Sequence, residues 1–588
     1  MKILLTAINA KYIHSNPAVY SLKAYAEAHG VRDCEIEIAE YTINQTVDQI
    51  LTDLYRRKPK VLCFSCYLWN IVYVEQLVRE LHKVLPKVEI WLGGPEVSWN
   101  AREVLERLSQ VRGVMRGEGE ETFLEVVDSY GGSGKKPEEI KGITFRRTQE
   151  ESDGADAEII ECTDRAPMAD LNDIPFVYEE LDAFENKIIY YESGRGCPFS
   201  CSYCLSSVDK CLRFRDLELV KRELQFFIDH RVPQVKFVDR TFNCRREHAL
   251  EIWQYLEEHD RGITNFHFEV AADLLGEKEL GLIAAMRPGL IQLEVGIQST
   301  NEQTIREIRR TMKFDKVKEV VRQIQKCGNV HQHLDLIAGL PFEDYKSFAK
   351  SFNDVYELKP EQLQLGFLKV LKGSYMEEMA EAYGLVYQDR PPFEVLSTKW
   401  LSYEDVIRLK GVEEIVEVYY NSGQFVKTLE LLERESTDAF SMYEALRDYY
   451  EENGLDKVNH TRLGRYEILA AFIAQYPERK NGFAESIKSE SAKRMKLYRE
   501  NLTYDLYLRE NVKNRPAFAG DPTVDKKTAS AFYEEEAKTH RYLKGYEQYE
   551  KRQMRKMTHL EQIAGELLLF DYQNRNPLTN QAAVYIVN

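Results

Sequence analysis

Hydrophobic and polar positions in residues 1–135 follow two alternating periods. Short runs of Ile, Leu and Val are typical of buried strands, and the segments between them place apolar residues three and four positions apart, as amphipathic helices do. The expected strands are residues 2–8, 35–38, 60–64, 88–92 and 113–116. Strands that alternate with helices favour a parallel sheet covered on both faces, so we expect a doubly wound α/β domain of the Rossmann or flavodoxin-like kind.

A second series of strand-like runs follows a connector at residues 136–186, which contains glycines and many charges. These runs are residues 187–191, 234–238, 266–270, 290–295, 333–337 and 364–368. They predict a second α/β domain over residues 187–378. Residues 379–588 have helical periodicity, and Ser402 and Asp405 form a capping-box pattern, so a mostly α-helical C-terminal domain is expected.

Three cysteines lie on one short loop directly after the strand expected at residues 187–191. They are Cys197, Cys201 and Cys204, with the spacing C-x₃-C-x₂-C. Cysteine thiolates are the usual ligands of iron–sulfur clusters. Three thiolates leave the fourth iron of a cubane open to a substrate or cofactor, whereas a structural zinc site closes its coordination with a fourth residue. The loop therefore predicts a 4Fe–4S cluster.

The cysteine loop resembles the signature of the radical S-adenosylmethionine (radical SAM) superfamily, including the aromatic Tyr203 before the third cysteine. The resemblance implies a partial (β/α)₆ barrel of the TIM type over residues 187–378. In that family the open iron binds S-adenosylmethionine, and an electron from the cluster releases a 5′-deoxyadenosyl radical. The resemblance places the S-adenosylmethionine site at strand ends, where such barrels bind ligands, and its residues are Tyr203, Glu269, Gln298, Arg310 and Asp335.

The same resemblance implies a role for each of these residues. Gln298 and Asp335 are expected at the ribose, and Glu269 near the methionyl end. Arg310 is expected on the methionine carboxylate, because a guanidinium pairs well with that group. After the second strand the chain has Asp-Arg-Thr-Phe-Asn at residues 239–243 in place of the Gly-Gly-Glu that many members carry. Which residues bind the methionine amine therefore stays open.

Glycine and acidic residues follow the later strands of the N-terminal domain. Glycines let the backbone approach a ligand closely, and a helix that starts next offers free N–H groups. The Gly-Gly-Pro-Glu and Gly-Glu-Gly-Glu loops resemble those of the cobalamin-binding domain at the N-terminus of one large radical SAM class, where they line the corrin and its nucleotide tail. The residues that this resemblance implies for cobalamin are Ser65, Gly93, Gly94, Glu96, Gly117, Glu118, Gly119 and Glu120.

The first loop of this domain departs from the family pattern. Cobalamin domains that supply a histidine to cobalt carry D-x-H-x-x-G after the first strand, whereas His14 here lacks both the aspartate and the glycine. Without that carboxylate nothing evident orients the imidazole. We therefore interpret His14 as a crevice residue and expect no protein histidine on the cobalt. Cys63 and Cys66 lie inside an apolar run and are interpreted as buried small residues rather than a metal or redox pair.

Composition and charge limit the classes of function and location that remain possible for the chain. The net charge of −17 disfavours a long nucleic-acid footprint, although basic groups near residues 493–499 and 551–556 leave room for a local basic surface. Tyr542, Tyr546 and Tyr549 between them are interpreted as one apolar helix face rather than a base-stacking surface. No segment is apolar for long enough to predict a membrane span, and the first residues lack the pattern of a secretion signal. A cytoplasmic protein is expected.

These observations favour a cobalamin-dependent radical SAM enzyme that methylates an unactivated carbon of a small-molecule or peptide substrate, served by an electron donor such as flavodoxin or ferredoxin. Radical rearrangement or cyclisation without net methylation uses the same cofactor sites and stays open, as does a sensor that binds cobalamin and a cluster. In all three cases both sets of loops lie at the carboxyl ends of parallel strands. The two domains should therefore meet mouth to mouth, with the C-terminal helices around the cavity.

Overall fold

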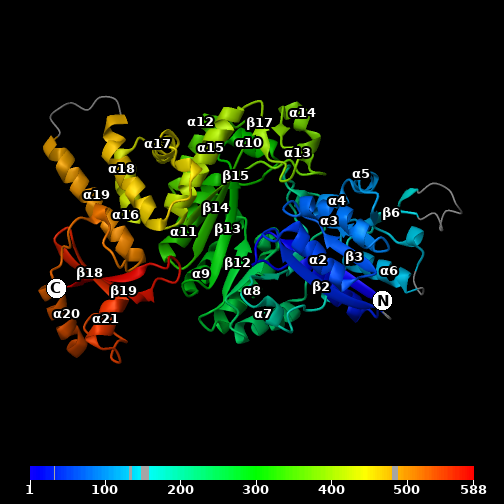
Figure 1. Ribbon diagram of the computed structural model, residues 1–588, viewed down its shortest axis with the longest axis horizontal. Coiled ribbons are helices and arrows are strands. Elements are labelled where there is room, and N and C mark those ends of the chain that lie inside the picture. The colour runs from blue at the N-terminus through cyan, green and yellow to red at the C-terminus, as the bar shows by residue number, and fades with distance from the viewer. Residues whose placement is uncertain (32–33, 132–134, 148–157, 480–487, 588) are drawn as a thin grey trace.

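The structure is a computed structural model that describes residues 1–31, 34–131, 135–147, 158–479 and 488–587. Along its longest axis an N-terminal α/β part, a central barrel and a C-terminal part follow one another (Figure 1). The two α/β parts lie side by side, and the C-terminal part lies on the far side of the barrel. The expected order of domains is therefore the order found in space.

The N-terminal sheet has the strand order β2-β1-β3-β4-β5-β6-β7. Its first five strands pair in parallel, whereas the last two, from the connector at residues 136–186, are added antiparallel. The strand order reverses between β1 and β3, the place where open α/β sheets bind ligands beyond the carboxyl ends of their strands. The strands are β1 Lys2–Asn9, β2 Glu35–Thr42, β3 Val61–Ser65, β4 Glu89–Gly93, β5 Val111–Met115, β6 Ile143–Arg146 and β7 Ile159–Glu161.

Helices cover both faces of this sheet because its strands alternate their apolar side chains between two cores. In β1, Ile3 and Leu5 belong to one buried cluster and Leu4 and Ile8 to the other. The doubly wound prediction is confirmed. The helices are α1 Pro17–Ala28, α2 Val47–Arg57, α3 Ile71–Val84, α4 Pro95–Ser98, α5 Ala101–Arg107 and α6 Glu120–Tyr130.

The central sheet consists of six parallel strands in the order β15-β14-β13-β12-β11-β8. β8 and β15 lie at opposite ends of that order, so the barrel is open between them, as predicted. The strands are β8 Ile189–Tyr191, β11 Gln234–Phe237, β12 Asn265–Glu269, β13 Ile291–Gln298, β14 His331–Ala338 and β15 Gln362–Phe367. The helices around them are α7 Leu217–Asp229, α8 Arg246–His259, α9 Glu277–Ala285, α10 Glu302–Glu307, α11 Phe314–Cys327 and α12 Tyr345–Tyr356.

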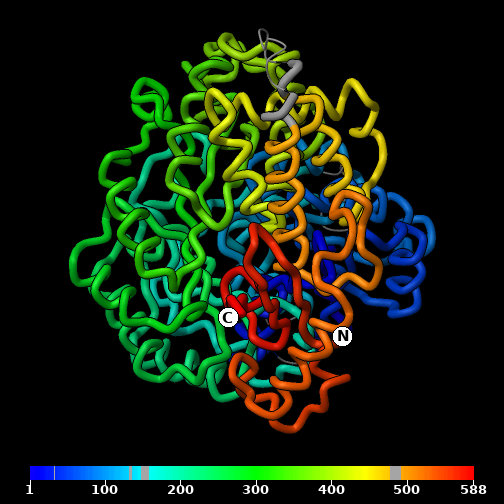
Figure 2. Tube along the Cα trace, turned by 90° about the vertical axis from the view of Figure 1, so that its left-hand side faces the viewer, coloured from blue at the N-terminus to red at the C-terminus, as the bar shows by residue number. Residues whose placement is uncertain are grey.

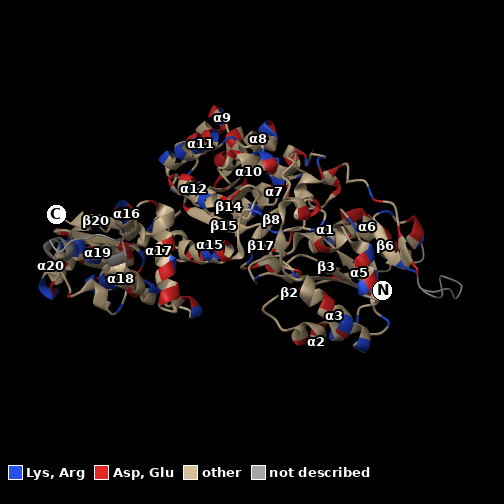
Figure 3. Cartoon of the chain, turned by 90° about the horizontal axis from the view of Figure 1, so that it is seen from above, with Lys and Arg blue, Asp and Glu red and all other residues tan. Residues whose placement is uncertain are grey.

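The barrel helices are held by narrow apolar faces. α11 buries Val317, Val320, Val321 and Ile324, which recur three and four residues apart, and it ends at Gly328 in a left-handed conformation with φ of 62°. Acidic and basic residues are mixed over the outer surfaces of α8, α9 and α11 (Figure 3). Each helix therefore offers one apolar side to the sheet and a charged side to solvent.

The C-terminal part consists mainly of helices, with a short antiparallel pair, β16 Val386–Tyr387 and β17 Val395–Ser397, and a small antiparallel sheet at its end, β18-β19-β20. The predicted capping box forms at Ser402 and Asp405 and opens α15. Figure 2 views the molecule from the side of this part. Its elements are α13 Tyr375–Glu378, α14 Ala380–Tyr383, α15 Tyr403–Val416, α16 Val426–Glu435, α17 Ala439–Glu452, α18 Arg462–Arg479, α19 Lys488–Arg509, α20 Lys526–Thr539, α21 Lys551–Met557, β18 Thr558–Ile563, β19 Glu566–Arg575 and β20 Ala582–Val587.

Aromatic and hydroxyl contacts join this part to the barrel helix α12. Tyr345 donates a hydrogen bond to Glu444 at 2.6 Å, and the hydroxyls of Tyr356 and Tyr443 lie 3.0 Å apart. The barrel core continues without a break into the C-terminal helices. Tyr546 is buried and donates to Asp571, so it packs in the core rather than on a base-stacking surface. The expected helix face is wrong, because Tyr542, Tyr546 and Tyr549 lie in the segment between α20 and α21, which is not helical. Among the described residues, no helix combines the length and apolar character that crossing a membrane requires.

Candidate active site between two α/β domains

The three cysteines lie on a loop held by a short antiparallel hairpin of β9 (Gly194–Arg195) and β10 (Arg213–Phe214). We call residues 196–212 the cluster loop. Cys197 and Cys201 are buried and Cys204 is half-buried. All three line one cavity of about 200 Å³ at the carboxyl ends of the barrel strands. Three thiols directed at one cavity match the ligand set that a cubane cluster with one open iron requires.

The same cavity gathers all of the residues predicted for S-adenosylmethionine. Its lining includes residues from the cluster loop, from β12, β13 and β14, and from the segment after α10, namely Tyr203, Glu269, Gln298, Asp335 and Arg310. We call this the cluster cavity. The residues are spread over more than a hundred positions of the chain, so their convergence follows from the barrel topology rather than from local sequence. The assignment of each to a part of S-adenosylmethionine stays a prediction.

Buried polar atoms in the cluster cavity fit a polar ligand. Gln298 Oε1 and Arg310 Nε are buried without a hydrogen-bond partner among the described residues. Gln298 also has φ of 72°, a left-handed conformation that non-glycine residues rarely adopt and that is common at functional sites. Arg310 Nη1 lies 3.2 Å from the Tyr203 hydroxyl and 3.6 Å from Cys201 Sγ. The guanidinium thus faces the cysteines, as a carboxylate-binding group beside the cluster would.

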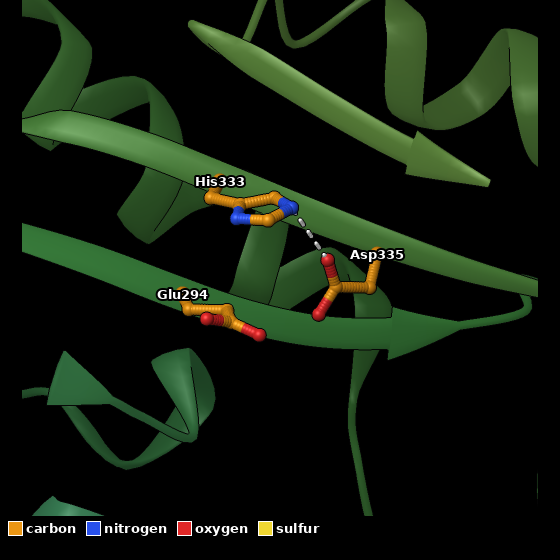
Figure 4. A group of neighbouring side chains, drawn as sticks. All are labelled: Glu294, His333 and Asp335. Carbon is orange, nitrogen blue, oxygen red and sulfur yellow. Dashed lines mark ion pairs between the residues drawn. The ribbon is translucent and has the colours of Figure 1, made fainter. Parts of the chain in front are cut away.

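A buried network of charged and imidazole side chains forms the wall of the barrel next to this cavity. Glu294 accepts from Lys236 Nζ at 3.1 Å and lies 3.0 Å from His267 Nε2. Next to Glu294, His333 Nε2 lies 3.0 Å from Asp335 Oδ1 (Figure 4). Burial alone would raise the pKa of Glu294, but the hydrogen bond from His267 and the charge of Lys236 lower it to about 2. Glu294 therefore stays ionised, and Lys236 already compensates its charge.

Glu269, in the same cavity, has a pKa shifted in the opposite direction to that of Glu294. Burial, assisted by the charge of Glu294, raises the pKa of Glu269 to about 7. A carboxyl group with this pKa changes its ionisation near neutral pH and responds strongly to a cation placed beside it.

A larger cavity of about 840 Å³ lies at the carboxyl ends of the N-terminal strands. We call it the N-terminal cavity. Its lining includes seven of the eight residues predicted for cobalamin, namely Ser65, Gly93, Gly94, Gly117, Glu118, Gly119 and Glu120. Gly94 has φ of 111°, and a Cβ there would lie 2.6 Å from the carbonyl oxygen of Cys66. Backbone packing thus requires a glycine at this position.

The eighth predicted residue, Glu96, does not line the N-terminal cavity among the described residues, because it pairs with a residue of the other domain. Its carboxylate is buried and accepts from Lys372 Nζ at 3.1 Å, in the segment that follows β15. The pKa of Glu96 is raised by burial in spite of that ion pair. Glu96 therefore joins the two domains. Cys63 and Cys66 are buried, as interpreted from the sequence, and burial raises the pKa of Cys63 to about 12.

Two arginines of the β9–β10 hairpin form ion pairs with the loop after β5. Arg195 lies 2.9 Å from Glu120 and 3.3 Å from Glu118, and Arg213 lies 2.7 Å from Glu118. The two arginines are opposite each other in the hairpin register. We call these four residues the interdomain clamp. From the sequence, both glutamates were assigned to cobalamin and their pairing with the two arginines was not predicted. The position of one arginine on each side of the cysteine loop was the feature of the sequence that could have indicated this pairing.

A third cavity, of about 590 Å³, lies between the two domains, and we call it the central cavity. Ser206 and Arg240 line all three cavities. The mouths of the two domains therefore face one another, which confirms the predicted geometry. His14 lines the central cavity, and its Nδ1 lies 2.6 Å from the Tyr190 hydroxyl across the domain boundary.

The expectation that the C-terminal helices surround this cavity is wrong for the described residues. The lining runs from residue 9 to residue 269, with no contribution from residues 379–588. The physical reason is that the C-terminal helices pack on α12 and on the open edge of the barrel.

Three family models match the chain. The B12 binding domain model matches residues 3–127, the radical SAM superfamily model matches residues 191–355, and a model described as a protein of unknown function (DUF4080) matches residues 381–586. The chain thus contains a radical SAM domain preceded by a B12-binding domain. These matches confirm the predicted 4Fe–4S cluster, S-adenosylmethionine and cobalamin as its cofactors.

Curated relatives include the cobalamin-dependent radical SAM methyltransferase TokK of Streptomyces tokunonensis, 25% identical over 67% of this chain and 62% of TokK. The 2-(S-pantetheinyl)-carbapenam-3-carboxylate methyltransferase of Streptantibioticus cattleyicolor is 24% identical over 67% of this chain and 61% of that protein. The chain thus spans about three fifths of the length of both. The structure of OxsB with aqua-cobalamin bound superposes with a TM-score of 0.60, at 13% identity over 86% of this chain and 80% of OxsB, which confirms the fold.

Removal of one clamp arginine should lower the stability of the protein. Arg195→Ala leaves the carboxylate of Glu120 buried without its cation, and we expect the free energy of unfolding to fall by about 3 kcal/mol. Chemical denaturation followed by tryptophan fluorescence measures the change. Arg222→Ala, on the exposed surface of α7, is the matched control, and equal effects of the two variants would contradict a clamp.

Proposed function

We propose that this radical SAM enzyme transfers a methyl group to an unactivated carbon of a substrate bound in the central cavity. The observation that supports the proposal is the meeting of three cavities, the cluster, N-terminal and central cavities, at Ser206 and Arg240. A reaction that uses two cofactors on one substrate needs such a junction, because the reacting groups must approach within a few ångströms. Two of the relatives described above are methyltransferases, which agrees with this choice of chemistry.

When bound, S-adenosylmethionine on the cluster supplies a 5′-deoxyadenosyl radical, and cobalamin supplies a methyl group for transfer. The chain's own residues hold and orient these groups. Cys197, Cys201 and Cys204 would ligate the cluster, and Arg310 would bind the methionine carboxylate next to them. The Gly93–Gly94 backbone and the start of α6 would border cobalamin.

The aromatic side chains of the junction would exclude water. Tyr203 is half-buried beside the cysteines. Tyr67 and Trp69 stack with ring centroids 4.5 Å apart at the edge of the central cavity. Flat apolar rings leave few sites for water and protect reactive chemistry. An electron donor such as flavodoxin or ferredoxin would reduce the cluster from outside.

Rearrangement or cyclisation without net methylation is the second candidate. Three of the relatives are anaerobic magnesium-protoporphyrin IX monomethyl ester cyclases, one of them 22% identical over 55% of this chain. Products separate the two candidates. Methyl transfer forms S-adenosylhomocysteine as well as 5′-deoxyadenosine, whereas rearrangement forms 5′-deoxyadenosine alone.

An anaerobic assay with cluster, cobalamin, reductant and S-adenosylmethionine tests the proposal. We expect wild-type protein to form both S-adenosylhomocysteine and 5′-deoxyadenosine, and Cys201→Ser to lose 5′-deoxyadenosine completely because a cluster ligand is gone. Cys211→Ser is the matched control, since Cys211 is exposed on the same cluster loop. Wild-type protein that forms neither product would contradict the proposal.

Binding of S-adenosylmethionine should depend on pH through Glu269. We propose that its carboxylate accepts hydrogen bonds from the ligand's ammonium group, so binding favours the ionised form. With a pKa of about 7 in the free protein, Glu269 gains a proton as the pH falls. The dissociation constant should then rise about tenfold from about pH 8 to about pH 6.

Equilibrium dialysis with radiolabelled S-adenosylmethionine measures this profile. Glu269→Gln should bind more weakly at the higher pH and show a flat profile, because the titrating group is removed. A wild-type profile that is flat over the same range would exclude the proposed role of Glu269.

Cobalt should have no histidine ligand from this chain. His14 lies in the central cavity with its Nδ1 against the Tyr190 hydroxyl, and the carboxylate that orients a ligating histidine is missing from its loop. Electron paramagnetic resonance of the Co(II) protein is therefore expected to show no protein-nitrogen superhyperfine splitting. Splitting that disappears in His14→Ala would overturn this prediction.

A further inference from the structure

Arg240 lies where the three cavities meet. It follows β11, and its side chain is exposed although it lines the cluster, N-terminal and central cavities together. A group that borders all three spaces is placed to touch the substrate where both cofactors act on it.

The backbone that carries Arg240 is fixed. Asp239 is buried, and its carboxylate accepts from the Ser193 amide at 2.9 Å and from the Ser193 hydroxyl at 2.7 Å. Phe242, two residues further on, is fully buried in the barrel core. The loop therefore presents a free guanidinium from a rigid base, which lowers the entropy lost when an anion binds.

The other charged groups around the central cavity are mostly paired within the protein. The pairs are Arg195 with Glu192 and Glu118, Arg213 with Glu118 and Asp209, and Lys236 with Glu294. Arg240 forms no ion pair with any described residue. Glu269 is the remaining carboxyl group on the lining, and it lies beyond ion-pair distance of Arg240.

The residues around Arg240 also indicate the chemistry of the rest of the ligand. Tyr67, Trp69 and Tyr190 line the central cavity, and the indole of Trp69 is 43% exposed, so apolar surface is available beside the guanidinium. Rings of this kind favour the flat or apolar body of a ligand. A guanidinium binds carboxylate or phosphate through two parallel hydrogen bonds.

We infer that the substrate is an anion with an apolar or aromatic body, and that Arg240 binds its carboxylate or phosphate group in the central cavity. The inference rests on the proposed function, since it assigns the central cavity to the substrate. Arg240 then fixes the orientation of the substrate carbon that faces the two cofactor cavities.

Matched probes test this assignment without turnover. 3-Phenylpropionate and 3-phenylpropionamide have the same body and differ in charge, and their binding to the full chain loaded with cluster, cobalamin and S-adenosylmethionine is measured by ligand-observed NMR. We expect the carboxylate to bind about tenfold more tightly than the amide. Arg240→Gln should abolish that preference, Arg240→Lys should keep part of it, and Arg222→Gln should leave it unchanged.

The anionic groups of the two cofactors could also bind Arg240. Two further measurements distinguish this binding from binding of the substrate. Equilibrium dialysis gives the affinity of each variant for S-adenosylmethionine, whose carboxylate could take this site, and absorbance titration gives the affinity for cobalamin, which carries a phosphate. We expect both affinities to change less than about twofold in Arg240→Gln. A large loss of either, or equal binding of the two probes by the wild type, would overturn the inference.

This result is independent of the product assay. A protein that binds the carboxylate through Arg240 but forms no S-adenosylhomocysteine would refute the methyl-transfer proposal alone. A protein that forms S-adenosylhomocysteine but shows no preference between the probes would refute the assignment of Arg240 alone.

Discussion

The arrangement of the site depends on the ion pairs between Arg195, Arg213, Glu118 and Glu120. Buried charges are stable only when paired in good geometry, so these contacts permit few relative positions of the cluster loop and the loop after β5. The cluster loop lines both cofactor cavities, and the loop after β5 lines the N-terminal cavity. The clamp therefore sets the distance between the two cavities and creates the central cavity as the space that remains between them.

Fold topology makes this contact possible. Both sheets are largely parallel, so the loops that follow their strands gather at one end of each sheet, where such sheets bind ligands. The β9–β10 hairpin projects its two arginines from the barrel into the first domain, while the ion pair of Glu96 with Lys372 ties a second N-terminal loop to the segment after β15. Two separate attachments resist rotation better than one, which favours a fixed junction.

The sequence was sufficient to predict a feature wherever that feature depends on a short segment of the chain. The cysteine spacing, the barrel strands and the strand-end residues such as Gln298 and Asp335 could be read from short motifs whose order matched a family. Glu96 could not be placed in this way, because its partner Lys372 lies 276 residues away. A glutamate in a glycine loop has the same local pattern whether it faces a ligand or a distant lysine, and only tertiary packing decides between them.

The position of the C-terminal part changes where specificity must be sought. Its helices continue the barrel core through α12 and contribute no described side chain to the central cavity. In the proposed function, contacts that distinguish one substrate from another come from the loops after β3 and β11 and from β8, at Trp69, Arg240 and Tyr190. Residues 379–588 act on the site indirectly, because they cover the open edge of the barrel and hold the strand β15 whose following segment carries Lys372.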